Sequence, residues 1–172
     1  PSDAIREGIA YVTEDRKGNG LFLIQDIKWN ITAANLGKVA PAGWINENEE
    51  IRVSYHYKNA LNVKAPSVEQ LVGNLSGGNQ QKVSLGKWMF VGPRLLILDE
   101  PTRGIDVGAK YEIYTIMNEL ISQGMSILMI SSELGEVLGM SDRVYVMAEG
   151  RITGELAIEE ADQEKIMQYA TL

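Results

Sequence analysis

The sequence lacks cysteine altogether and contains a single histidine among its 172 residues. Without cysteine the chain can form neither a disulfide framework nor a thiolate metal site, and a reducing compartment is its natural setting. No uninterrupted apolar run approaches the roughly 20 residues of a membrane-spanning helix. The segment Pro1 to Asp3 does not begin a signal peptide, which has a basic start and an apolar middle. These absences leave a globular domain without a membrane span as the expected class.

Basic side chains are also in the minority, with 16 Lys and Arg against 23 Asp and Glu and a formal net charge of -7. This balance argues against a general attraction to nucleic acid or anionic lipid, although a local basic patch stays possible. Apolar residues make up 45% of the chain, which is enough to bury a sizeable core in one domain of this length.

The order of apolar segments predicts an α/β fold with a mainly parallel sheet covered by helices on both faces. Weakly apolar helical segments from about residue 31 to residue 72 predict an inserted helical subdomain. A hairpin around the turn Glu149-Gly150 and a last helix from about Glu159 to Tyr169 are expected to close the chain. The remaining predicted elements are strands at 8–12, 95–98 and 126–131 and helices at 76–90, 109–121 and 133–138. Ser76 and Asp106 are the expected N-terminal caps of the first two of these helices.

Two adjacent carboxylates, Asp99 and Glu100, follow the apolar strand Leu95 to Leu98. Ligands of open α/β sheets bind outside the carboxyl ends of the strands, where a nucleotide hydrolase needs such groups. By that geometry Asp99 is the candidate Mg²⁺ ligand and Glu100 the candidate base that polarises the attacking water. The alternative is a buried strand whose acidic end merely caps the next element, and this short pattern alone leaves both interpretations open.

The residues Ser76, Gly77 and Gly78 precede a predicted helix about twenty positions before Asp99. Two glycines behind a capping serine expose backbone N–H groups at a helix N-terminus, where the helix dipole favours an anion such as a γ-phosphate. Alone, this pattern is better explained as an ordinary glycine-rich turn. Together with the two carboxylates and the segment Pro101 to Asp106, it indicates a nucleotide site.

At these residues the chain resembles the ATP-binding subunits of ABC transporters. The segment Leu75 to Gln80 is similar to the signature motif of that family, Leu95 to Glu100 to Walker B, and Gly104 to Asp106 to the D-loop. The string 75–82, with 13–17 upstream and 130–134 downstream, narrows the resemblance to the second ATPase half of tandem monosaccharide importers, the ribose, galactose, xylose and multiple-sugar group.

The resemblance implies a partial P-loop NTPase core in a single domain. Residues 1–30 would hold the first strand and the Q-loop region, 31–92 the helical subdomain with the signature, and 93–172 Walker B, the D-loop, the switch region and the final hairpin and helix. The sequence contains no Gly-x-x-x-x-Gly-Lys-Ser/Thr loop, since Gly37-Lys38 and Gly86-Lys87 lack the flanking residues it requires. In the family this loop would lie upstream of Pro1.

The resemblance also implies how the site works. ATP would be held between the P-loop of one ATPase half and the signature of the other, so Ser76, Gly77 and Gly78 would serve a nucleotide bound by a partner half. Asp99 would hold Mg²⁺, Glu100 would be catalytic, and Asp106 would be the D-loop residue. The expected partners are the other half of the same tandem protein, membrane permease subunits and, indirectly, an extracytoplasmic sugar-binding protein, with no nucleic acid. The expected location is the cytoplasmic face of the membrane, as a peripheral protein.

Two positions depart from the family pattern. Glu14 stands at the Q-loop position, where Gln is usual, and cannot donate an amide hydrogen bond. Ser132 stands at the switch position, where His is usual, and cannot become cationic beside a γ-phosphate. These replacements suggest slow or absent hydrolysis at the site of this half, so a degenerate regulatory half that completes its partner's site is the alternative function. A soluble DNA-repair ATPase is disfavoured by the acidic charge.

Three other features have simpler explanations. His56 lies in the helical region, where we expect it to be an exposed bystander. Tyr111, Tyr114 and Met117 could form a base-stacking surface, but their helical spacing favours packing in the core. The charged segment Asp15 to Lys17 could face the permease, as in the family, or be a solvated charge cluster.

Overall fold

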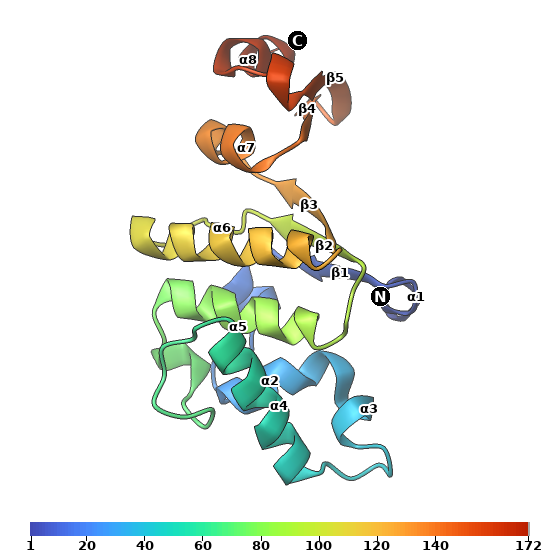
Figure 1. The fold of residues 1–172 in the computed structure, drawn as a ribbon, viewed down its shortest axis with the longest axis vertical. Coiled ribbons are helices and arrows are strands. Elements are labelled where there is room, and N and C mark those ends of the chain that lie inside the picture. The colour runs from blue at the N-terminus through green and yellow to red at the C-terminus, as the bar shows by residue number, and fades with distance from the viewer. Residues whose placement is uncertain (172) are drawn as a thin grey trace. The chain divides into compact units, whose positions relative to one another are not determined.

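The computed structural model describes residues 1–171 and forms two compact units, the first being Pro1–Ile130 and the second beginning at Ser131 (Figure 1). The first unit contains a three-stranded parallel sheet in the order β1-β2-β3, built from β1 (Ile9–Val12), β2 (Leu95–Asp99) and β3 (Ser126–Ile130). Ala10 pairs with Leu96, and Leu96 pairs in turn with Ile127. The predicted α/β class and the parallel sheet are confirmed.

One face of this sheet is buried under helices. Ala10, Val12, Leu96 and Leu98 point to that face and are at most 2% exposed. Helix α5 (Gly77–Met89) packs against β1, and α6 (Val107–Ser122) packs against β3 and against α5. Figure 1 shows α5 and α6 running side by side on the same side of the strands.

The prediction that helices cover both faces is wrong. Tyr11, Leu128 and Ile130 on the second face are 44%, 48% and 47% exposed. The reason is topological, because the strands follow one another in a single direction across the sheet. Right-handed crossovers between strands added in one direction place their connecting helices on the same face. A second covered face requires the strand order to reverse, and it does not reverse within residues 1–130.

The helical subdomain lies between β1 and β2 in the sequence. The chain begins with a short helix, α1 (Ser2–Arg6), followed by strand β1 and a π-helical turn at Arg16–Gly20. The subdomain then contains α2 (Ile27–Thr32), α3 (Leu36–Val39) and α4 (Glu47–Ala60), with 3-10 turns at Ala33–Asn35 and Val72–Asn74. Helix α2 packs against both α4 and α5. Thr32 donates a buried hydrogen bond of 2.9 Å to Glu50. The predicted insertion is confirmed, and His56 in α4 is exposed as expected.

Two side chains set the starts of the long helices. Ser76 caps α5 and Asp106 caps α6, the latter by accepting a 2.9 Å hydrogen bond from the backbone of Ala109. Both caps were predicted. Met117 is buried at 2% exposure, but Tyr111 is 73% exposed, so the core position predicted for Tyr111 is wrong. At this exposure the side chain of Tyr111 cannot be part of the packed contact between α6 and its neighbours.

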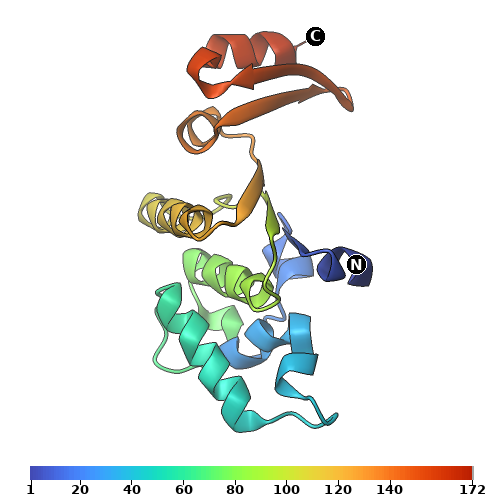
Figure 2. The same cartoon turned by 45° about the vertical axis from the view of Figure 1, so that its right-hand side comes forward.

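The second unit contains α7 (Leu134–Met140), a hairpin of β4 (Arg143–Ala148) and β5 (Arg151–Ala157), and α8 (Gln163–Ala170), seen together in Figure 2. Glu149 and Gly150 have φ values of 48° and 77°, the left-handed pair that a tight hairpin turn requires. The last helix begins later than predicted because Ile158–Glu160 forms a 3-10 turn and Asp162 caps α8. The core of this unit consists of Val144, Val146, Leu156 and Ile166. Across residues 1–171, no helix has the length and apolarity needed to cross a membrane.

Candidate functional site

The first predicted motif forms the start of α5. Ser76 has an extended backbone, and its hydroxyl oxygen lies 3.5 Å from the backbone nitrogen of Asn79, while Gly77 and Gly78 are the first residues of the helix. Helix α5 spans 13 residues, so its first N–H groups and its dipole create a positive potential at this end. The exposed cap and the two glycines present these donors to an incoming anion.

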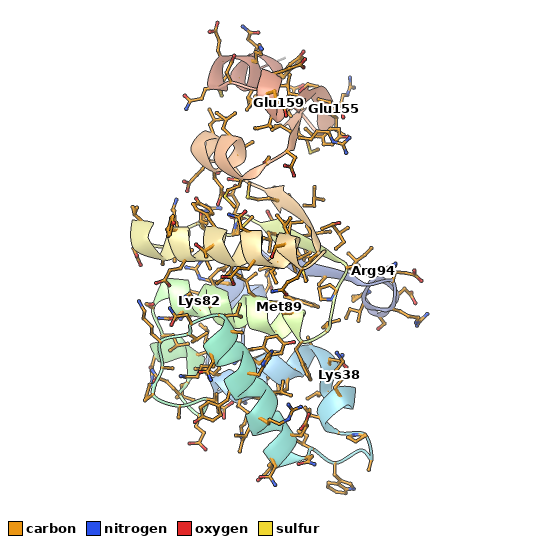
Figure 3. The ribbon with its side chains drawn as sticks, in the orientation of Figure 1. Lys38, Lys82, Met89, Arg94, Glu155 and Glu159 are labelled. Atoms are coloured by element: carbon orange, nitrogen blue, oxygen red, sulfur yellow. The ribbon has the colours of Figure 1, made fainter. Side chains whose placement is uncertain are left out.

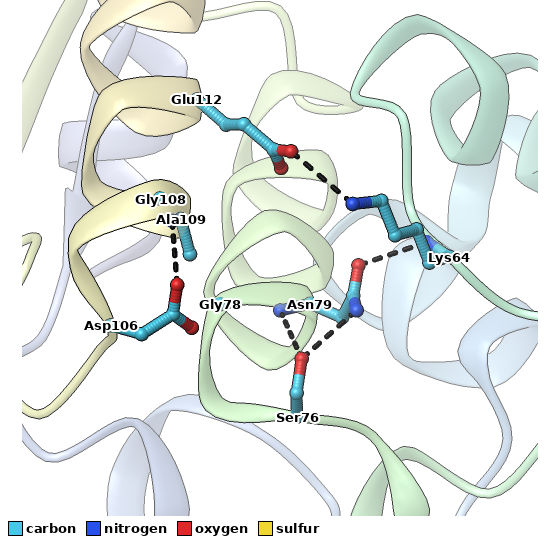
Figure 4. Close-up of a pocket in the computed structure, with 8 residues that line it drawn as sticks. All are labelled: Lys64, Ser76, Gly78, Asn79, Asp106, Gly108, Ala109 and Glu112. Atoms are coloured by element: carbon cyan, nitrogen blue, oxygen red, sulfur yellow. Dashed lines mark hydrogen bonds and ion pairs between the residues drawn. The ribbon is translucent and has the colours of Figure 1, made fainter.

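A pocket of about 220 Å³ opens beside this turn (Figure 4). Its walls come from Ser76 to Asn79, which we call the signature turn, from the first turns of α6 and from the loop after α4. The lining residues are Lys64, Ser76, Gly78, Asn79, Asp106, Gly108, Ala109 and Glu112. The structure therefore brings Ser76 and Gly78 of the predicted signature together with Asp106 of the predicted D-loop.

Close packing explains why glycine occupies both positions after Ser76. A Cβ atom added to Gly78 would lie 2.5 Å from the Cβ of Ala109, inside the contact between α5 and α6. A Cβ atom at Gly77 would lie 3.1 Å from Nη2 of Arg16 and 3.3 Å from the carbonyl oxygen of Gly104. The signature turn is thus fitted against the D-loop and against the loop that follows β1.

A buried lysine, Lys82, is paired with Glu112, one of the residues that line the pocket. Lys82, labelled on α5 in Figure 3, is 1% exposed and donates to the carboxylate of Glu112 on α6 and, at 2.8 Å, to the carbonyl oxygen of Asn62. The Glu112 carboxylate also pairs with Lys64 at 3.4 Å. The hydrogen bond from Lys82, followed by the charge of both lysines, holds the pKa of Glu112 below its usual range. Two cations thus neutralise one acid beside the signature turn.

Arg16 ties the loop after β1 to the D-loop. Its guanidinium donates to the carbonyl oxygen of Arg103 at 2.8 Å and to that of Gly104 at 3.4 Å. In return, the side chain of Arg103 forms an ion pair with Glu14. Partial burial lowers the pKa of Arg16. We call these two reciprocal links the arginine clasp, and they show that Arg16 turns inward while its neighbour Lys17 is exposed.

The second predicted motif lies at the carboxyl end of β2. Asp99 accepts a 2.6 Å hydrogen bond from the hydroxyl of Tyr11 on the neighbouring strand. This hydrogen bond, together with desolvation and the charge of Asp99, raises the pKa of Tyr11. Glu100 has a φ of 48°, and its backbone nitrogen donates to the carbonyl oxygen of Ile130 at 2.8 Å. A left-handed glutamate directly after a strand is a strained conformation of the kind that gathers at functional sites.

Asp99 and Glu100 at the carboxyl end of β2, which we call the carboxylate edge, fit a magnesium ion only in combination with phosphates. Within the described part of the chain, no group of three or more His, Cys, Asp or Glu side chains could hold a metal ion by itself. Magnesium at phosphate sites commonly uses one or two carboxylates, with the remaining ligands from phosphate oxygens and water. Asp99 meets that need at the end of a strand. Ser132, the predicted switch residue, follows β3 by two positions and belongs to the second unit.

Comparison with known proteins shows the family of the chain. Residues 2–103 match the family model described as ABC transporter. The chain is 62% identical to the L-arabinose transport ATP-binding protein AraG of Geobacillus stearothermophilus over 99% of this chain and 33% of that protein. It is 56% identical to the xylose import ATP-binding protein XylG of Thermoanaerobacter pseudethanolicus, covering 99% of this chain and 34% of the relative. The chain thus spans about a third of the length of such relatives.

Solved structures agree on the fold. MJ1267, an ATP-binding cassette of an ABC transporter, superposes with a TM-score of 0.80 at 22% identity, covering 98% of this chain and 70% of that one. MJ0796, solved as a dimer in a post-hydrolysis state bound to ADP and Pi, gives a TM-score of 0.73 at 16% identity, over 89% of this chain and 64% of its own. At these identities the likeness supports the architecture alone.

Proposed function

Because this chain belongs to the ABC transporter family, we propose that it is part of the second ATPase half of a tandem monosaccharide importer. Its signature residues Ser76, Gly77 and Gly78 complete the site of an ATP that a partner half holds through its own P-loop. The observation that carries the proposal is the pocket at the start of α5, where the serine cap lies beside Asp106. The names of the arabinose and xylose import relatives support the substrate class.

The carboxylate edge has the second role in this proposal. Asp99 holds Mg²⁺ and Glu100 orients and polarises the attacking water at the site centred on this half. When bound, the ion neutralises phosphate charge, and the chain's own part is to place Asp99 at the end of β2 and Glu100 directly after it. The left-handed backbone of Glu100 turns this residue away from the line of the strand.

The alternative is that this half regulates and completes its partner's site without hydrolysing ATP. One observation favours it, namely that Glu14 pairs with Arg103 instead of presenting an amide. A carboxylate committed to an ion pair is poorly suited to the donor role of the usual Gln. Ser132 in place of His supports the same reading. The two hypotheses assign the same role to the signature residues. They differ only in whether ATP is hydrolysed at the site of this half.

The rest of the proposal concerns the setting. Both compact units belong to one ATPase domain, which acts at the cytoplasmic face of the membrane against permease subunits. The sugar is delivered by a separate binding protein, and its identity is set by that protein and the permease. The exposed Lys17 and the helical subdomain form the face turned to the permease.

The test compares two variants in the full-length protein assembled with its permease. Ser76→Arg places a bulky cation where the partner's nucleotide must dock, so ATPase and uptake are abolished. Glu100→Gln removes one group from a site that already lacks the usual Gln and His, and it leaves a substantial fraction of both activities. Ser122→Arg at the exposed end of α6 is the matched control and keeps full activity. If Glu100→Gln proves as damaging as Ser76→Arg, this half is a full catalytic site. Full activity of Ser76→Arg refutes the signature role.

A further inference from the structure

The hydroxyl of Ser76 is held by one neighbour, Asn79. The side-chain nitrogen of Asn79 donates to the Ser76 hydroxyl oxygen at 3.0 Å, and its backbone nitrogen approaches the same oxygen at 3.5 Å. The other end of the Asn79 amide accepts a 2.8 Å hydrogen bond from the backbone nitrogen of Lys64. Figure 4 shows this chain of contacts running from Lys64 through Asn79 to Ser76.

The direction of each hydrogen bond in this chain is fixed by chemistry. A backbone N–H can only donate, so the Asn79 atom facing Lys64 must be the amide oxygen. The remaining Asn79 atom is therefore the NH₂ group, which has no lone pair to offer. Consequently the Ser76 oxygen must accept at this contact. The backbone of Lys64, fifteen residues away in sequence, thus decides which way the Ser76 hydroxyl is used.

The Ser76 proton is left for a group outside the chain. A serine hydroxyl has two acceptor sites and one donor, and both acceptor sites are directed at Asn79. Among residues 1–171, Ser76 donates no hydrogen bond, and its side chain is exposed in the pocket at the start of α5. A pocket whose hydroxyl can only donate outward is suited to an anionic oxygen and poorly suited to a donor or a cation.

We propose that Asn79 is a positioning residue that presents the Ser76 hydroxyl as a donor to the terminal phosphate of a nucleoside triphosphate held by the partner half. This inference rests on the proposed function and adds a residue to it. The amide oxygen of Asn79 is hydrogen-bonded to Lys64 and its amide nitrogen to Ser76, so the role assigned to this residue acts through Ser76. A donor fixed before the ligand arrives needs no reorientation as charge develops on the phosphate during transfer.

Two substitutions separate this role from a structural one. Asn79→Asp keeps the shape and still accepts from Lys64, but its second oxygen can only accept, so the Ser76 proton turns inward. In the full-length protein assembled with its permease, we expect kcat for ATP to fall at least about tenfold, comparably to Ser76→Ala. The melting temperature is unchanged or raised, because a carboxylate near a helix N-terminus is favourable. Asn118→Asp, an exposed position on α6, is the control for the added charge.

Asn79→Leu removes the amide without adding charge. We expect this substitution to lower kcat about fivefold or more when Ser76 is present. In a protein that already carries Ser76→Ala, it should lower kcat less than about twofold, because Asn79 acts through the Ser76 hydroxyl. The inference alone is overturned if Asn79→Leu lowers kcat by the same factor with Ser76 present and with Ser76→Ala. It is also overturned if Asn79→Asp and Asn79→Leu keep full activity while Ser76→Ala is impaired. If Ser76→Ala and Ser76→Arg both retain wild-type ATPase activity, the proposed function fails, and the inference fails with it.

Discussion

The start of α5 and the carboxyl end of β2 are built in opposite ways. The signature turn is enclosed by the first turns of α6, by the D-loop and by Arg16, and an added methyl group at Gly78 would strike Ala109. At the end of β2, Asp99 has one hydrogen bond from a half-exposed tyrosine, and Glu100 adopts a strained backbone. The first region is held by contacts among several elements, whereas the second combines a half-exposed hydrogen bond with a strained backbone. Removing packing or charge contacts in the first should therefore cost more stability than removing the Tyr11 hydrogen bond in the second.

The largest expected loss comes from Gly78→Ala. The new Cβ lies 2.5 Å from the Cβ of Ala109, so α5 and α6 must move apart, which costs about 2–3 kcal/mol of unfolding free energy. Urea denaturation followed by circular dichroism measures it. Adding Ala109→Gly removes the clash and should restore most of the loss. A single variant as stable as the wild type would show that the tight contact is not real.

The next largest loss is expected for Glu112→Gln, which replaces the carboxylate beside the buried ammonium of Lys82 with a neutral amide, so that only uncharged acceptors, the new amide oxygen and the Asn62 carbonyl, remain. Removing one partner of a buried pair costs about 3–5 kcal/mol, and the partial exposure of Glu112 reduces this to about 1–2 kcal/mol. Glu119→Gln on the exposed side of α6 is the control.

The same pair gives a pH dependence. The pKa of Glu112 is depressed in the folded chain, so its contribution to stability is complete above the ordinary carboxyl pKa of about 4.3 and is lost as the pH falls through the folded value. The stability difference between wild type and Glu112→Gln should therefore shrink in acid below about pH 4. A difference that stays constant between pH 7 and pH 3 would contradict this assignment.

At the carboxyl end of β2, the informative comparison is between Glu100→Gly and Glu100→Ala. Both substitutions remove the carboxylate with its contacts, but only glycine adopts a φ of 48° without the steric cost of a side chain, so Glu100→Gly should be about 1 kcal/mol more stable than Glu100→Ala. Thermal unfolding by calorimetry is the measurement. Equal stability of the two variants would mean that the backbone at residue 100 is not strained.

The smallest effect is expected for Tyr11→Phe. The substitution removes a hydrogen bond to Asp99 from a side chain that is 44% exposed, so water replaces the lost partner and the cost is about 0.5 kcal/mol. Denaturation midpoints of the two proteins under the same conditions check it. If Tyr11→Phe lowered the unfolding free energy by about 2 kcal/mol, this hydrogen bond would contribute as much to stability as the packed contacts around the start of α5.

Local signals in the sequence predicted the elements well. The caps Ser76 and Asp106, the strand that ends at Asp99 and the turn at Glu149-Gly150 depend on residues within a few positions of one another, so a single sequence contains their cause. Prediction failed where burial depends on topology. Tyr111 has the right helical spacing for the core, yet it is exposed, and the open face of the sheet follows from strand order, which no local pattern records.

The site shows the same division. The predicted residues Ser76, Gly78 and Asp106 line one pocket, but the groups that hold them were missed. Arg16 bonds to carbonyls 87 and 88 residues away, and Lys64 reaches Asn79 only after the loop between α4 and α5 has folded back. The one available signal was Arg16 in a charged loop, which was interpreted as a surface contact. Such tertiary partners cannot be inferred from spacing within one segment.

The arginine clasp also has a consequence for the architecture of the chain. The whole helical subdomain and α5 are enclosed between Arg16 and Arg103, and the pairing of Val12 with Leu98 closes the same loop only a few residues away. Once the two strands pair, the clasp forms at little additional entropic cost, because the pairing has already brought the two ends of this loop together. The entropy of closing the loop also depends only weakly on its length. The subdomain is therefore a module whose two ends are anchored side by side. Evolution can lengthen, shorten or exchange such a module while the sheet beneath it keeps its register.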